Sequence, residues 1–211
     1  MRARTSQLKM RRLITMYDFL WPLFVFAFAT SFTPGPNVVM LAASGANYGF
    51  RSTLPHISGI SIGFPVMVIA IGVGLKAAFV AAPELQTVLK YVGGAYLLYL
   101  AWRIANAGRP QGKGGRRRPM NFLEAAAFQW VNPKGWIMAV AAVTTYTPGN
   151  DNLAETLTVA AVFALMAWPS CAFWAGVGVA VRLFASDRAM RIFNLTMAAL
   201  LLASLVLAFW E

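Results

Sequence analysis

The stretch Thr33-Pro34-Gly35-Pro36-Asn37 interrupts an apolar run that extends over residues 17–48. Proline lacks a backbone N–H, and its ring clashes with the preceding turn of a helix. Two prolines around a glycine therefore predict a helix that breaks here and begins again at Pro36. A lipid bilayer needs about 20 apolar residues for each spanning helix. Because the run is longer than that, we predict one spanning helix with a break near its middle.

The composition of the whole chain also indicates a membrane protein. Hydrophobic residues make up 59% of the 211 residues, charged residues only 12%, and the mean hydropathy is +0.61. Soluble domains carry about 25% charged residues, so this chain has too little polar surface to cover a soluble core. These values exclude a soluble enzyme, a secreted disulfide scaffold and a disordered regulator as leading classes.

Five further apolar runs follow, and together the six runs predict an all-α polytopic membrane protein with six transmembrane helices. The five runs cover residues 54–80, 85–105, 121–147, 154–184 and 189–210. Asn132-Pro133-Lys134 interrupts the fourth run as the proline stretch interrupts the first. We therefore expect the first and fourth helices to be broken.

The prolines divide the chain into two similar halves. Pro34 and Pro36 in the first helix are followed by Pro65 in the second, and Pro133 in the fourth is followed by Pro169 in the fifth. Because each half has three helices, the second half must enter the membrane from the opposite side. A 3+3 inverted repeat with broken helices in matching positions is typical of secondary transporters, whose site lies at the breaks. The alternative is that prolines are simply common in membrane helices.

Basic residues predict the domain organisation and the orientation. We divide the chain into a first repeat at 16–105, a basic linker at 106–119 and a second repeat at 120–211. The positive-inside rule places the linker in the cytoplasm and both termini outside. The polar, basic extension 1–15 conflicts with this, so we expect Met16 to be the physiological start. The alternative is an inside N-terminus with one span fewer before the linker.

Four motifs occur in order along the chain. They are Thr33-Pro34-Gly35-Pro36-Asn37, the glycines Gly59, Gly63, Gly72 and Gly74, the string LKYVGGAYLLYL at 89–100, and Asn132-Pro133-Lys134. In this order they resemble the LysE/RhtB superfamily of bacterial amino-acid exporters, over roughly residues 16–210. The strings at 49–53, 59–64 and 128–132 are similar to its cysteine/O-acetylserine exporter branch.

The resemblance implies a secondary transporter in the bacterial cytoplasmic (inner) membrane. It would export amino acids or derivatives such as cysteine or O-acetylserine, with coupling to protons, by alternating access of the two broken helices. The sequence contains no GxxxxGK[ST] motif, so direct drive by ATP is not expected. We expect a small-molecule substrate, protons and the lipid bilayer as partners. We expect no enzyme activity, nucleic-acid partner or cofactor.

The first break offers backbone and side-chain groups to a substrate. A helix that begins at Pro36 presents N–H groups suited to a carboxylate. The last carbonyls before the break, near Ser31 and Phe32, suit an ammonium group, and Thr33 and Asn37 add polar side chains. We expect Thr33, Pro34, Gly35, Pro36 and Asn37 to bind substrate. The alternative is a structural kink whose groups neighbouring helices satisfy.

The second break places a lysine near the middle of the bilayer. Lys134 follows Asn132 and Pro133 about eleven residues into its run, and a charge at that depth needs a cavity or a partner. We expect these three residues to bind substrate as well, with Lys134 binding a carboxylate or losing its proton. The alternative is a helix that enters obliquely, so that Lys134 reaches the surface.

Two titratable residues are candidates for proton coupling. Glu124, one turn into the fourth run, would carry protons if burial desolvated it. His56 near the start of the second run would relay protons because histidine titrates near neutrality. The alternatives are a solvated carboxylate and a histidine that only hydrogen-bonds a neighbour.

Residue counts limit the rival functions. One cysteine (Cys171) and one histidine exclude a thiol pair or a Cys/His metal cluster within one chain. A metal-ion or other small-solute exporter of the same superfamily remains the alternative, although a metal route needs several carboxylates within the spans. Gly45, Gly49, Gly59 and Gly63 suit close packing of helices, either within the chain or in a homo-oligomer.

Overall fold

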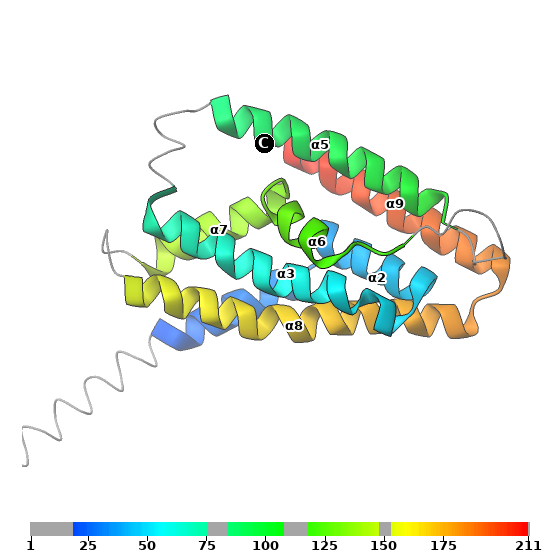
Figure 1. The fold of residues 1–211 in the computed structure, drawn as a ribbon, viewed down its shortest axis with the longest axis horizontal. Coiled ribbons are helices and arrows are strands. Elements are labelled where there is room, and N and C mark those ends of the chain that lie inside the picture. Colours follow the sequence, from blue (N-terminus) through cyan, green and yellow to red (C-terminus); the bar gives the residue numbers. More distant parts are fainter. Residues whose placement is uncertain (1–18, 76–83, 108–117, 148–152, 211) are drawn as a thin grey trace, which may run out of the picture.

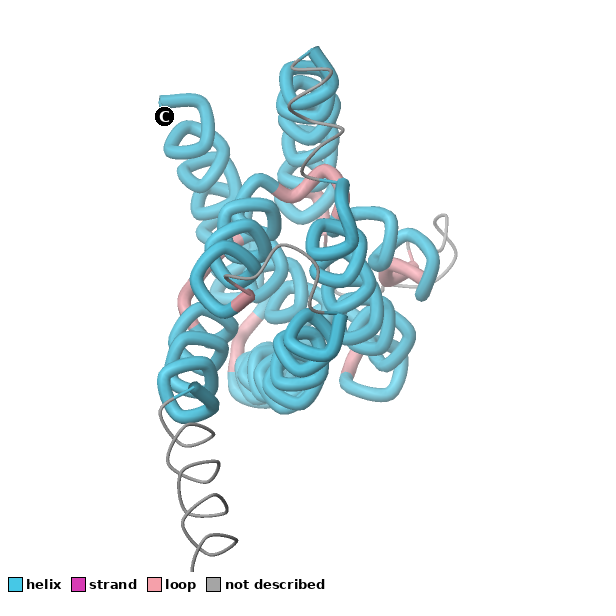
Figure 2. The backbone as a smooth tube through the Cα atoms, turned by 90° about the vertical axis from the view of Figure 1, so that its left-hand side faces the viewer, coloured by secondary structure: helices cyan, strands magenta, loops and turns pink. Residues whose placement is uncertain are grey.

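The computed structural model describes residues 19–75, 84–107, 118–147 and 153–210, which are helical with no strand among them. Figure 1 shows the long helix α8 (Leu153–Phe184) along the lower edge of the molecule, with other helices running roughly alongside it, and Figure 2 shows the same helices from one end. The extension 1–15, the Met16 start and most of the linker 106–119 lie outside the described residues. The all-helical prediction is confirmed for the part that the structure describes.

The first apolar run is broken where the sequence predicts it. One helix covers Phe19–Phe32, and α2 (Pro36–Tyr48) follows at a bend of 53°. Gly35 is the N-cap of α2 in an extended conformation, and Pro36 is its first residue, where a missing N–H costs nothing. The predicted break is therefore a change of helix direction.

Prolines elsewhere do not break their helices. The helix α3 (Phe50–Ala70) continues through Pro55 and Pro65 into the π-helical turn η1 (Ile71–Leu75). Similarly, α8 contains Pro169 without interruption. A single proline removes one backbone hydrogen bond, which a long helix with packed neighbours tolerates.

The fourth run also consists of two helices, as predicted. These are α6 (Phe122–Gln129) and α7 (Pro133–Tyr146), with residues 130–132 between them. The remaining helices, α5 (Glu84–Ala105) and α9 (Asp187–Trp210), lie side by side in Figure 1 and pack against each other.

Glycines bring the helices close together. A Cβ atom on Gly59 would clash with the backbone of α6 at Phe122, and one on Gly63 would lie 2.7 Å from Cα of Ala126. Gly45 similarly contacts the backbone of α8 at Ala175. These glycines thus pack helices of the same chain, which is one of the two alternatives that the sequence left open.

Three helices in the described residues are long and apolar enough to cross a membrane, and the bent pair Phe19–Phe32 and Pro36–Tyr48 would make a fourth. The three cover Phe50–Gly74, Leu153–Phe184 and Asp187–Val206. Their outward faces carry large apolar side chains, for example Leu165 and Ile192, which are more than half exposed. Such a surface is suited to lipid rather than water.

Candidate functional site

The two helix breaks lie against each other. Lys134, at the start of α7, donates from Nζ to the carbonyl of Thr33 at 2.6 Å and to that of Pro34 at 3.4 Å. A Cβ atom on Gly35 would lie 2.6 Å from Cδ of Lys134, so the lysine side chain occupies the space that glycine leaves. A cation from one half of the chain therefore satisfies the carbonyls of the break in the other half.

A pair of amides joins the same two regions. Asn37 in the first turn of α2 donates to Oε1 of Gln129 at 2.8 Å, and Nε2 of Gln129 contacts Oδ1 of Asn37 at 3.3 Å and the carbonyl of Ala125 at 2.8 Å. Gln129 is fully buried at the end of α6. Gln129 was not predicted as a site residue, although a glutamine inside an apolar run is a signal that could have indicated it.

A serine from α8 completes the first break. Ser170 is buried and donates to the carbonyl of Ser31 at 2.8 Å. This residue also was missed, and its position next to Pro169 was the available signal. We expected the carbonyls near Ser31 and Phe32 to receive a substrate ammonium, and that of Ser31 already has Ser170 as its partner. The carbonyls of Thr33 and Pro34, which follow them, have Lys134.

Asn132 presents an unsatisfied group at the second break. The residue is the N-cap of α7, and Pro133 is the first residue of that helix. Its side chain is 2% exposed and makes no capping bond, and Oδ1 has no hydrogen-bond partner among the described residues. Burial of an unpaired acceptor is costly, so this oxygen is available for a ligand.

Most of these residues line one pocket, whose space not filled by protein atoms, about 490 Å³, includes space open to the outside. Its lining consists of Thr30, Ser31, Thr33, Gly35, Asn37, Val38, Ile60, Phe64, Asn132, Lys134, Gly135, Met138, Ala167, Ser170 and Cys171. Lys134 is the charged residue among them, and Ile60 and Phe64 belong to the apolar part. We call this the central pocket. One cation, several amide and carbonyl groups and apolar side chains suit a small zwitterion with a short side chain.

Helix starts add to the electrostatics of the central pocket. Both α2 and α7 begin there, with Pro36 and Pro133 as their first residues. The first N–H groups of a helix have no partner within it, and the helix dipole is positive at this end. Both features favour an anionic group such as a carboxylate near residues 37 and 134.

Glu124 lies at the surface of the first turn of α6. Its carboxylate forms a bidentate ion pair with Arg118 at 2.6 and 2.9 Å and completes a capping box with Asn121. The side chain is 34% exposed. The expectation that Glu124 carries protons required a buried carboxyl, and this burial is not observed.

His56 is buried, but in a different place from Lys134. It is 1% exposed, and neither ring nitrogen has a hydrogen-bond partner among the described residues. It lines a second pocket, beside Ser44 and Asn47 of α2. The structure therefore brings the two breaks together and leaves both proton-coupling candidates outside the central pocket.

Comparison with known proteins gives the family. The model of the LysE type translocator family matches residues 28–209. The chain belongs to this family. It is 30% identical over 166 residues to the cysteine/O-acetylserine efflux protein of Escherichia coli K12 and equally to that of Shigella sonnei, covering 78% of this chain and 83% of the relative. No solved structure matches.

Membership of the LysE family confirms the resemblance found in the sequence. The family and its efflux-protein relatives identify a transporter with a small-molecule substrate rather than an enzyme. The apolar helices agree with a multi-pass membrane protein. In the described residues no group of three or more histidine, cysteine, aspartate or glutamate side chains could hold a metal ion.

Proposed function

We propose that this LysE-family chain exports amino acids or close derivatives from the cytoplasm across the bacterial inner membrane. The observation that carries the proposal is the contact between Lys134 and the carbonyls of Thr33 and Pro34 beside the central pocket. The names of the relatives favour cysteine and O-acetylserine as first substrates to test.

The contact suggests how a zwitterion binds. The ammonium of the substrate takes the place of the Lys134 ammonium at the carbonyls of Thr33 and Pro34, because both are cations that donate hydrogen bonds. Lys134 then pairs with the substrate carboxylate, together with the helix start at Pro36. Asn37 and Asn132 bind the remaining polar groups. The substrate therefore replaces the hydrogen bonds between Lys134 and the first break. As the substrate binds, its ammonium becomes the partner of the carbonyls of the break.

The transport cycle is alternating access between two three-helix repeats. Each repeat begins with a broken helix (Phe19–Phe32 with α2, and α6 with α7), and the third helices α5 and α9 pack together. This pattern supports six spans with the second half inverted, entering the membrane after the basic linker 106–119. Met16 remains our proposed start.

Export is coupled to protons in this proposal. His56 is the better candidate carrier, because it is buried without a hydrogen-bond partner in the described part of the chain. Glu124, which is paired with Arg118, would act only after that ion pair opens. Replacement of Glu124 by Gln tests this role.

The test uses inside-out membrane vesicles that contain the overproduced protein. Uptake of labelled O-acetylserine, cysteine, threonine, leucine and lysine is measured with and without a protonophore. We expect uptake of the small neutral substrates, loss of uptake with the protonophore, and loss in Asn37→Ala and Lys134→Ala. Asn106→Ala and Lys90→Ala, which change exposed residues of the same types, are the matched controls.

Two results would contradict the proposal. Absence of protein-dependent uptake of every amino acid, from protein that is correctly inserted, would exclude amino-acid export, and metal ions would be tested in the same vesicles. Uptake that survives the protonophore would exclude proton coupling but leave export intact.

A further inference from the structure

A second pocket is lined, like the central pocket, by residues of α2 and α3. Its space not filled by protein atoms, about 430 Å³, includes space open to the outside. Its lining consists of Met40, Ala43, Ser44, Asn47, Tyr48, His56, Leu100, Arg103, Ile104, Ala107, Arg118, Pro119 and Met120. We call it the vestibule. On α2 the lining changes from Asn37 and Val38 in the central pocket to Met40 and the residues after it in the vestibule.

Most polar side chains of the vestibule are satisfied within the protein. Ser44 contacts the hydroxyl of Thr53 at 2.9 Å, and Asn47 exchanges hydrogen bonds with Asn194 at 2.7 and 3.1 Å. Among the buried polar side chains His56 is the exception, since neither ring nitrogen has a partner among the described residues. A neutral imidazole has one donor and one acceptor, and leaving both unpaired is costly. The ring therefore has capacity for a ligand with both kinds of group.

The vestibule has an excess of positive charge. Arg118 is paired with Glu124, whereas Arg103 has no carboxylate partner in the described part of the chain. Arg103 donates instead to the carbonyl of Arg118 at 2.8 Å and lies 5.8 Å from the ring of Tyr99. The two positive charges of Arg103 and Arg118 are thus only partly balanced by the single negative charge of Glu124. A ligand with a carboxylate would balance the remaining positive charge.

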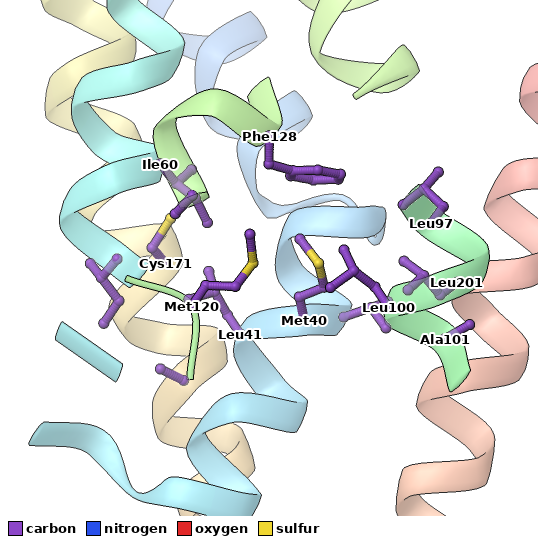
Figure 3. Packing of buried hydrophobic residues seen from close by; sticks show 14 of the residues in the cluster. Met40, Leu41, Ile60, Leu97, Leu100, Ala101, Met120, Phe128, Cys171 and Leu201 are labelled. Carbon is purple, nitrogen blue, oxygen red and sulfur yellow. The ribbon is translucent and has the colours of Figure 1, made fainter. Parts of the chain in front are cut away.

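An apolar layer separates the vestibule from the central pocket. Leu41, Ile57, Met120 and Phe128 are no more than 5% exposed and belong to one apolar cluster, and we call these four residues the plug. Met120 also lines the vestibule, and Ile60 of the same cluster lines the central pocket. Figure 3 shows Met120 and Leu41 between Ile60 and Cys171 on one side and Met40 on the other. Buried apolar side chains thus stand between residues that line the two pockets.

We propose that the vestibule is a second binding site for an amino acid, distinct from the central pocket. Arg103 binds the carboxylate and His56 binds the ammonium group or a polar side-chain group. This inference rests on the proposed export of amino acids and adds a site at which the solute waits until the plug opens. Because the basic linker follows α5, whose last turn carries Arg103, the vestibule faces the side that the positive-inside rule places in the cytoplasm.

The composition of the chain provides one probe for each pocket. The protein has one histidine, which lines the vestibule, and one cysteine, Cys171, which lines the central pocket. Protein labelled with ¹⁵N-histidine and ¹³Cβ-cysteine and held in lipid nanodiscs is titrated with O-acetylserine. Two sites predict that the His56 and Cys171 signals shift with different midpoints.

Variants then separate the pockets. Lys134→Ala should remove the shift of the Cys171 signal and leave that of the His56 signal. Arg103→Gln should remove the shift of the His56 signal and leave that of the Cys171 signal. Asn37→Ala replaces Lys134→Ala if the lysine variant does not fold, and Lys90→Ala is the control that should change neither signal. Serine methyl ester, which lacks the carboxylate, should shift the His56 signal with a midpoint at least tenfold higher than that of O-acetylserine.

The outcomes distinguish this inference from the proposed function. If the His56 signal follows the Cys171 midpoint and is lost in both central-pocket variants, the vestibule is not a separate site, and export through the central pocket stands. If the methyl ester shifts His56 as well as O-acetylserine does, carboxylate recognition in the vestibule is wrong. If neither signal responds to any amino acid of the vesicle panel, the proposed function fails and this inference fails with it.

Discussion

The two helix breaks have the same local design, but their backbone groups are satisfied from different parts of the chain. At the first break the partners come from the second half of the sequence. Lys134 binds the carbonyls of Thr33 and Pro34, and Ser170 binds that of Ser31. The conformation of this break therefore depends on contacts between residues more than 90 positions apart.

The second break is satisfied mostly by its own residues. The N–H groups of Trp130 and Val131 bond back three residues, to Ala127 and Phe128, which tightens the end of α6. The indole of Trp136 donates to the carbonyl of Trp130 at 2.8 Å. The backbone groups of this break thus find their hydrogen-bond partners within the second half, although Asn37 and Gly93 of the first half pack beside it.

The two breaks therefore differ in whether a substrate can replace one of their hydrogen-bond partners. A competing cation can replace Lys134 at the first break, because the lysine is a flexible side chain that donates across the central pocket. Nothing comparable holds the second break. We therefore expect substitutions at the first break to lower transport, and substitutions at the second break to lower the stability of the fold.

The largest effect is expected for Lys134→Ala. Hydrogen bonds to charged groups contribute about 1.5–3 kcal/mol, and about 1.4 kcal/mol corresponds to a factor of ten. Transport of O-acetylserine in inside-out vesicles should therefore fall at least about tenfold. Lys90→Ala, an exposed lysine on α5, should transport normally. Transport by Lys134→Ala within twofold of the unmodified protein would show that the first break does not need this cation.

Gly93→Ala should destabilise the protein through the second break. A Cβ atom on Gly93 would clash with the carbonyl of Val131, and a backbone group cannot easily move. Overpacking of this kind costs about 1–3 kcal/mol, which should appear as a lower thermal unfolding temperature in detergent. Gly176→Ala is the matched control, because no atom lies within 4 Å of its Cβ position. Equal unfolding temperatures for the two variants would contradict the close packing of α5 on this break.

Gly35→Ala should affect transport more than stability. The backbone of Gly35 is extended, with φ of −178°, so alanine adopts it without strain. The new Cβ would lie 2.6 Å from Cδ of Lys134, and the flexible lysine would move away from Thr33. We expect a several-fold loss of transport with little change in unfolding temperature. The opposite pattern, a large loss of stability with normal transport, would mean that the two breaks do not differ in the way described.

The smallest effect is expected for Trp136→Phe. The change removes the indole N–H that bonds Trp130 and keeps a ring that packs against it. A hydrogen bond of this kind contributes about 1 kcal/mol to stability. Thermal unfolding should detect this loss, while transport at a permissive temperature stays near that of the unmodified protein. A loss of transport without a loss of stability would show that the second break also takes part in substrate binding.

Much of the fold was predictable because the signals are local. The apolar runs at 85–105 and 154–184 match α5 and α8 to within one residue at each end. The breaks at Pro36 and Pro133 were predictable because proline acts on its own turn of helix. The site was predicted only in part. Lys134 was expected to bind substrate, whereas Gln129 and Ser170 gave no more than a weak signal in an apolar run.

Glu124 shows why the rest was not predictable. Its place one turn into the run left both a buried and a solvated carboxyl open, and in the structure Asn121 and Arg118 hold it at the surface of α6. Whether a carboxyl is buried depends on where a short helix is placed by its neighbours. That placement follows from Gly59 and Gly63 packing against α6, which are contacts between different parts of the chain.

The sequence by itself determined the membrane class, the apolar runs and the positions of the two breaks. Hydropathy and the effect of proline on a helix depend on neighbouring residues, so a short stretch of chain is enough to predict an apolar run or a helix break. Only the tertiary structure decided that Lys134 binds Thr33, that Ser170 binds Ser31 and that His56 lies in a separate pocket. These pairings depend on how whole helices pack, because a buried polar group bonds whichever partner the packing brings within reach.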